Sequence, residues 1–273
     1  MVSTLLILAG YVLLGELVLL GLATAVFISG SQRAETRRHA IRRLRQRAPW
    51  LGILVGVLVV NKLVRDIIPE ISWLIGWNIT PLIHRFEGAL VADLQSLASP
   101  TVTLYFSFIY IYGYVFLLVF PFIVYLALED HEPMQTTAVA YTLNYTLGLL
   151  LYVLFVSYGP RNLIPDLVQP LLYSTFPQSQ ILTSAVNTNT NVFPSLHTSL
   201  SVTAAGLAYL TRNHYPAWAA TAAFLAVSIT AATMYLGIHW VSDVVAGVAL
   251  GLLSLVLARR FVARRAAKTL DTE

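Results

Sequence analysis

Long runs of apolar residues divide the sequence, and they constrain the fold more than any other feature. The first run, from Leu5 to Ile28, contains one charged residue, Glu16, and exceeds the roughly 20 residues that a helix needs to cross a bilayer. Hydrophobic residues make up 57% of the chain and charged residues 11%, whereas soluble domains carry about 25% charged residues. The composition excludes a soluble globule and also disordered, collagen-like and coiled-coil folds.

The expected fold class is an all-α, multi-pass transmembrane bundle with about seven spans. The apolar runs cover approximately residues 4–28, 49–64, 102–128, 135–158, 195–211, 217–236 and 239–258. We expect an N-terminal helix and a basic loop (1–48), a six-helix catalytic core (49–258) and a basic tail (259–273). Residues 61–99 mix charged with apolar residues, which predicts amphipathic helices at the membrane interface.

Basic residues are concentrated in three segments beside the apolar runs. Thirteen of the 17 lysines and arginines lie there: seven between Arg33 and Arg47, Arg212, and five between Arg259 and Lys268. Seven alternating spans place the three segments on one side, which the positive-inside rule makes cytoplasmic. We therefore expect a protein of the cell membrane whose basic residues contact anionic headgroups, and no binding of nucleic acid.

Three short polar segments lie at span ends on the opposite, outer side. They are residues 157–162 (SYGPRN), 193–198 (FPSLHT) and 235–243 (YLGIHWVSD). Nothing in the alternation of spans requires these segments to share a side. Their common side therefore predicts a single site on the extracytoplasmic face.

The residue types in these segments suit phosphoryl transfer through a phosphohistidine. His239 and Asp243 are four residues apart, so that on a helix they share a face. The carboxylate would accept one imidazole N–H and leave the other nitrogen with a lone pair for attack. His197 could donate a proton, and Ser195 opens a helix whose N-terminus favours phosphate. Arg161 adds a planar guanidinium for phosphate oxygens.

These motifs resemble those of the type 2 phosphatidic acid phosphatase superfamily of membrane phosphatases and lipid phosphotransferases. The family's Pro-Ser-Gly-His motif is similar, with leucine in place of glycine, to Pro194, Ser195, Leu196 and His197. Its His-x3-Asp motif is similar to His239 and Asp243, and the resemblance covers roughly residues 135–258. It implies that His239 is the nucleophile, Asp243 its partner and His197 the general acid. No metal or organic cofactor is implied.

The phosphate-binding residues expected from this reading are Arg161, Pro194, Ser195 and Leu196. Three further positions differ from the phosphatase pattern: Leu154 stands where the family has a lysine, and Ala232-Thr233 replaces Ser-Arg. The Phe-Pro-Ser-Leu-His segment and Met234-Tyr235-Leu236 are instead similar to the inositol phosphorylceramide synthase branch. We therefore expect a lipid phosphotransferase, with membrane lipids as substrate and as possible acceptor.

Three alternatives remain open. The first is a hydrolase of the same superfamily, acting on lipid phosphates or polyprenyl diphosphates. The second is a zinc-dependent membrane hydrolase with His197, His239 and Asp243 as ligands, since two histidines and a carboxylate form a known zinc ligand set. The third is a transporter, although the chain shows no internal repeat of the kind found in many transporters.

Overall fold

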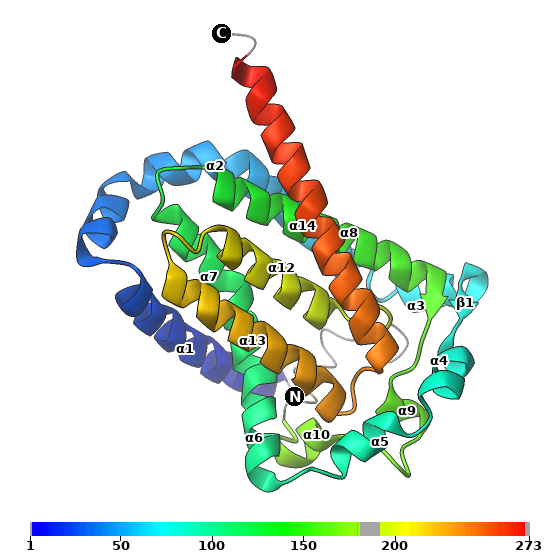
Figure 1. The fold of residues 1–273 in the computed structure, drawn as a ribbon. Coiled ribbons are helices and arrows are strands. Elements are labelled where there is room, and N and C mark those ends of the chain that lie inside the picture. Colours follow the sequence, from blue (N-terminus) through cyan, green and yellow to red (C-terminus); the bar gives the residue numbers. More distant parts are fainter. Residues whose placement is uncertain (1, 179, 181–191, 271–273) are drawn as a thin grey trace.

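The apolar runs form the long helices of an all-α bundle (Figure 1). The computed structural model describes residues 2–178, 180 and 192–270. Within these residues, six helical rods are long and apolar enough to span a membrane. They are α1 (Val2–Phe27), α2 (Gly30–Val64), the continuous rod of α6 (Pro100–Phe108), η1 (Ile109–Gly113) and α7 (Tyr114–Leu126), α8 (Glu132–Leu154), α13 (Pro216–Tyr235) and α14 (Val241–Leu270). The predicted multi-pass, all-α bundle is confirmed.

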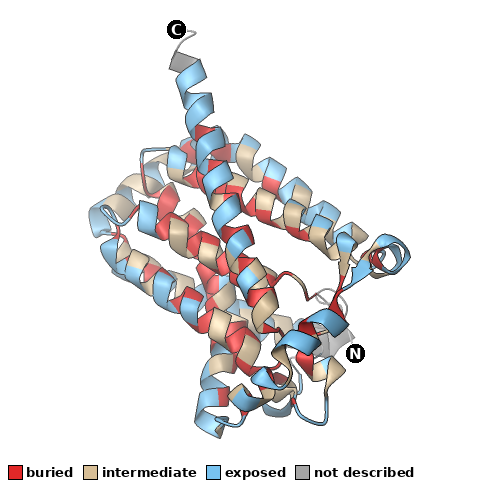
Figure 2. Ribbon diagram, turned by 45° about the vertical axis from the view of Figure 1, so that its right-hand side comes forward, coloured by how far each residue is buried: buried red, intermediate tan, exposed pale blue. Residues whose placement is uncertain are grey.

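The remaining predicted span, residues 195–211, is the short helix α12 (Leu196–Leu210). Its 15 residues are fewer than the roughly 20 that cross a bilayer. α12 lies in the middle of the bundle, where it packs against α8, α13 and α14 (Figure 1). Figure 2 shows buried residues along this central helix and exposed residues along the outer helices. Because protein surrounds α12, it does not need the length or the apolar surface of a helix that faces lipid.

Hydrogen bonds and close backbone contacts hold α12 in place. Asn144 of α8 is fully buried and donates to the hydroxyl of Thr203 (3.0 Å), and Thr203 donates to the carbonyl of Gly251 on α14 (3.2 Å). A Cβ atom added at Gly251 would lie 2.5 Å from the carbonyl oxygen of Ser199, and one at Gly247 equally close to that of Ser195. The two glycines form a Gly-x3-Gly pattern, which lets helix backbones approach closely inside a membrane.

The basic segment before the second span is helical, which corrects the expectation of a loop. The hydroxyl of Ser29 accepts the N–H of Gln32 (3.3 Å), and the Gln32 side chain accepts the N–H of Ser29 (3.1 Å). This capping box starts α2 ahead of the arginines. Arg43 and Arg47 are buried and donate to backbone carbonyls of the last residue of α7 and of the residues that follow it. The basic tail is also helical, as a continuation of α14 to Leu270.

The two ends of the bundle differ in composition. At one end, here called the basic end, Arg38, Arg43 and Arg259 line a common cavity with the last turn of α12. The other end, here called the site end, lies where α13 ends and α14 begins, and short elements gather there (Figure 1). They are α3 (Ile68–Ile75), β1 (Trp77–Asn78), α4 (Thr80–Glu87), α5 (Leu90–Gln95), β2 (Phe155–Val156), α9 (Pro160–Leu163) and α10 (Leu171–Thr175). The helices expected within residues 61–99 are α3, α4 and α5.

Candidate active site

The three polar segments of the sequence meet at the site end. The backbone N–H of Arg161 donates to the carbonyl of Gly237 (3.1 Å), which joins the first segment to the third. The backbone N–H of Ser195 donates to the carbonyl of Asp243 (2.9 Å), which joins the second to the third. Backbone hydrogen bonds therefore fix the relative positions of all three segments.

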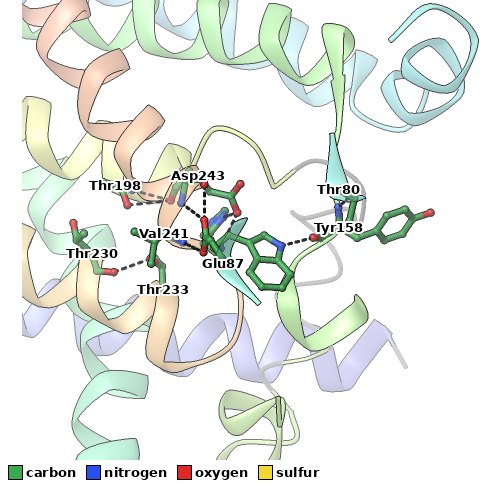
Figure 3. A network of polar contacts seen from close by, with 12 residues as sticks. Thr80, Glu87, Tyr158, Thr198, Thr230, Thr233, Val241 and Asp243 are labelled. Carbon is green, nitrogen blue, oxygen red and sulfur yellow. Dashed lines mark hydrogen bonds and ion pairs between the residues drawn. The ribbon is translucent and has the colours of Figure 1, made fainter. Parts of the chain in front are cut away.

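Two glycines and one indole allow the first and third segments to pack tightly. A Cβ atom at Gly159 would lie only 2.3 Å from the carbonyl oxygen of Ile238, so only glycine fits there. Gly237 has a φ of 73°, a conformation that other residues adopt at a steric cost. The indole N–H of Trp240 donates to the carbonyl of Tyr158 (2.8 Å, Figure 3). These contacts hold the turn between α13 and α14, which carries the predicted nucleophile.

His239 and Asp243 form the predicted pair, although His239 precedes α14 instead of sharing a helix face with Asp243. His239 is 4% exposed and Asp243 is fully buried in the first turn of α14. The carboxylate Oδ2 lies 3.4 Å from Nδ1 of His239 and accepts the backbone N–H of Trp240 (2.9 Å). The carboxylate thus caps the helix and contacts the imidazole, and it favours the tautomer that leaves Nε2 unprotonated.

Arg161 lies close enough to act on His239 electrostatically. Burial, and then the Arg161 guanidinium, lower the pKa of His239 below its ordinary value, so the imidazole is neutral at neutral pH. Nη2 of Arg161 donates to the hydroxyl of Tyr173 (3.1 Å), and the guanidinium lies over the Tyr173 ring. Nη1 is buried and has no hydrogen-bond partner among the described residues. A buried donor without a partner, beside a neutral imidazole, is well suited to bind an anion.

His197, the predicted proton donor, is the second residue of α12 and a neighbour of His239. The centroids of the two imidazole rings are 6.3 Å apart. The described residues hold no group of three or more histidine, aspartate or glutamate side chains with the spacing of a metal site. The geometry of His197, His239 and Asp243 therefore gives no support to the zinc alternative.

The residues of the Pro-Ser-Leu-His segment cap α12 and pack against α8. The hydroxyl of Ser195 accepts hydrogen bonds from the N–H and the hydroxyl of Thr198 (3.3 and 3.1 Å), which caps α12. Leu196 packs on Gly148 of α8, where a Cβ atom would lie 2.5 Å from the leucine side chain. Gly148 thus accommodates the leucine that replaces the family's glycine. Pro194 is buried in the turn before α12. Phosphate binding by these three residues stays a prediction.

Glu87 of α4 is a site residue that the sequence analysis missed. Its carboxylate accepts the backbone N–H groups of Val241 (2.8 Å) and Ser242 (2.6 Å) and the hydroxyl of Ser242 (Figure 3). Two carboxylates therefore accept backbone N–H groups at the start of α14: Asp243 accepts that of Trp240, just before the helix, and Glu87 accepts those of Val241 and Ser242. Both side chains lie at the positive end of the helix dipole.

The rest of one face of α4 also contacts the site. Thr80, His84 and Glu87 are spaced four and three residues apart, so they lie on one side of the helix. The hydroxyl of Thr80 accepts the N–H of Tyr158 (3.1 Å, Figure 3), and the ring of His84 lies 5.8 Å from that of Trp240. This spacing is visible in the sequence and could have indicated that α4 docks on another element through polar side chains.

One comparison with known proteins gives a match. A family model described as the PAP2 superfamily matches residues 82–257. The match begins inside α4 and extends through α14, so it includes Glu87 and reaches further upstream than the motif resemblance, which covers roughly residues 135–258. No curated protein and no solved structure matches the chain significantly.

Proposed function

Because the chain belongs to the PAP2 superfamily, as a match over more than half of its length shows, we propose that it is an integral membrane lipid phosphotransferase. Family membership supports a lipid phosphatase or phosphotransferase type of function, and the apolar helices support insertion in a membrane. The observation that carries the proposal is the neutral, buried imidazole of His239 between Asp243 and Arg161, with His197 beside it.

The proposed reaction is a double displacement. Nε2 of His239 forms a bond to phosphorus, the bond from phosphorus to the leaving oxygen breaks, and that oxygen takes a proton from His197. In the second step, His197 takes the proton of an acceptor hydroxyl as its oxygen attacks phosphorus, and the phosphorus–nitrogen bond breaks. His239 and protonated His197 are thereby regenerated, and Nη1 of Arg161 binds a phosphate oxygen in both steps.

The charge of the site supports phosphodiesters over phosphomonoesters as substrates. A phosphomonoester is close to dianionic at neutral pH, whereas a diester carries one negative charge. The positions at which the phosphatase pattern has two further cations carry Leu154 and Thr233. Leu154 is 41% exposed at the end of α8, and the Thr233 hydroxyl donates to the carbonyl of Thr230 (Figure 3). Each missing charge-assisted hydrogen bond costs roughly 1.5–3 kcal/mol, which disfavours the dianion.

The first prediction tests the nucleophile. His239→Ala should lower turnover by many orders of magnitude, because the covalent step is lost. Wild-type protein quenched during turnover of a phosphorus-labelled lipid should carry acid-labile label on His239. Phosphopeptide mass spectrometry checks the position, and the exposed His214 of the basic end, changed to alanine, serves as the control. Retention of more than about a tenth of the wild-type rate by His239→Ala contradicts the mechanism.

The second prediction separates transferase from hydrolase. In one detergent, we expect kcat/KM for a phosphatidylinositol-type diester to exceed that for phosphatidic acid by about tenfold or more, which corresponds to about 1.4 kcal/mol. With labelled substrate and an added lipid or polyol alcohol, mass spectrometry should find the label in a new lipid. A preference for phosphatidic acid with free phosphate as product favours the alternative, a lipid phosphate or polyprenyl diphosphate phosphatase.

A further inference from the structure

A π-helical turn interrupts the rod that passes behind the site. The turn η1 joins α6 to α7, and its widened geometry is marked by the N–H of Tyr114, which donates to the carbonyl of Ile109 five residues earlier. Such turns are rare and occur frequently at functional sites. Here the turn and the residue that follows it present two tyrosines, Tyr110 and Tyr114, to α12.

Both tyrosine rings lie against the imidazole of His197. The Tyr110 ring is stacked on it, with centroids 4.7 Å apart and an interplanar angle of 22°. The Tyr114 ring is tilted by 38°, with a centroid distance of 4.3 Å. Among the described residues, no hydrogen bond holds the His197 ring. His239 has a carboxylate to orient it, whereas His197 has two aromatic faces.

Aromatic faces suit a residue that alternates between a neutral and a cationic form. The face of a phenol ring carries negative charge density and attracts a cation placed over it. A carboxylate partner would also attract an imidazolium, but it would hold the proton more tightly by a hydrogen bond. Two rings can stabilise the charged form without accepting its proton.

We propose that Tyr110 and Tyr114 are positioning residues for the general acid His197. Their rings hold the imidazole beside His239 and stabilise the imidazolium that must give its proton to the leaving oxygen. This inference rests on the proposed function, in which the bond between phosphorus and that oxygen breaks as the proton arrives.

The leaving group provides a test that a purely structural role would not pass. An alkoxide, such as the one released from phosphatidic acid, needs a proton as it departs. A p-nitrophenolate is stable without one, so it depends little on a general acid. Impaired delivery of the proton therefore slows the reaction of phosphatidic acid and spares that of p-nitrophenyl phosphate.

The experiment compares kcat/KM for both substrates in purified variants. Tyr110→Leu and Tyr114→Leu should each lose roughly 10²-fold with phosphatidic acid, within the usual contribution of general acid catalysis, and less than threefold with p-nitrophenyl phosphate. Tyr110→Phe and Tyr114→Phe, which keep the rings, should restore most of the loss. Tyr112→Leu is the matched control, because Tyr112 lies in the same turn but contacts Phe108 and Gly15.

His197→Ala separates failure of the inference from failure of the proposed function. One outcome is that His197→Ala loses activity with phosphatidic acid but not with p-nitrophenyl phosphate, while the leucine variants show no such selective loss. The inference about the tyrosines is then wrong, and the assignment of His197 as general acid is kept. If His197→Ala affects both substrates equally, the general acid assignment itself fails. Should the leucine variants not fold, fluorinated phenylalanines at position 114 keep the ring and weaken its negative face. If kcat/KM for phosphatidic acid does not fall as the ring is fluorinated, the inference is wrong.

Discussion

At the scale of single residues, one carboxylate oxygen of Asp243, Oδ2, makes two contacts. Oδ2 accepts the N–H of Trp240, which caps α14, and it contacts Nδ1 of His239. Oδ1 is buried without a hydrogen-bond partner among the described residues. An amide in this place could still accept the backbone N–H through its oxygen. It could not accept from Nδ1 with the same strength, because the negative charge would be gone.

We therefore expect Asp243→Asn to fold and to lose activity. The amide can select the wrong imidazole tautomer, an effect that costs roughly 10⁴-fold in the Ser-His-Asp triad. The measurement is kcat for the wild type and the variant, with thermal unfolding in the same detergent as the check on folding. Equal kcat values would mean that Asp243 only caps the helix.

At the scale of elements, the distance between α12 and α14 sets the distance between the two histidines. His197 opens α12, and His239 lies immediately before α14. The two helices touch through Gly247 and Gly251, each close to a backbone carbonyl of the α12 segment. A carbonyl of the backbone cannot rotate away as a flexible side chain would. Added volume at these glycines must therefore move a helix.

Gly247→Ala should separate α12 from α14 and lower both stability and kcat. Overpacking of this kind costs typically 1–3 kcal/mol, and the shift moves His197 away from His239. Thermal unfolding and kcat of the purified variant check this expectation. The matched control is Gly56→Ala on α2, where an added Cβ meets nothing within 4 Å. A Gly247→Ala variant as stable and active as this control would show that the helices can separate without consequence for the site.

Several elements could be predicted from local patterns, and the exceptions have physical reasons. Hydropathy indicated the long helices because lipid-facing surfaces must be apolar, but it does not distinguish a spanning helix from an enclosed one such as α12. The helical start of the basic segment has a local signal in Ser29 and Gln32, which the dense arginines obscured. The docking of Glu87 on Val241 joins residues 154 positions apart, and no periodicity in the sequence records such a pairing.

At the scale of the whole molecule, the clustered arginines and the candidate active site lie at opposite ends of the bundle. Arginines of α2 and Arg259 of α14 share the basic end, and His239 with Arg161 lies at the site end. From the positive-inside rule we propose that the basic end is cytoplasmic and the site end extracytoplasmic. This orientation follows from charge and from the alternation of spans, and it can be tested without knowledge of the substrate.

Single cysteines report the orientation cleanly, because the natural sequence has none. Gln178→Cys at the site end and Gln46→Cys at the basic end both occupy exposed positions. In intact cells, a membrane-impermeant maleimide should label position 178, and position 46 should react only after lysis. The opposite pattern of labelling would invert the protein and place its chemistry in the cytoplasm.

The contact between Glu87 and α14 also has a consequence for biosynthesis. The ribosome completes α4 long before it reaches Val241 and Ser242, whose N–H groups the Glu87 carboxylate accepts. During that interval α4 has no partner for its carboxylate, and neither His239 nor Asp243 has been made. Under the proposed mechanism, a partly synthesised chain therefore has no assembled site with which to attack the lipids around it. Under that mechanism, reactivity begins only after α14 has been made and has entered the membrane.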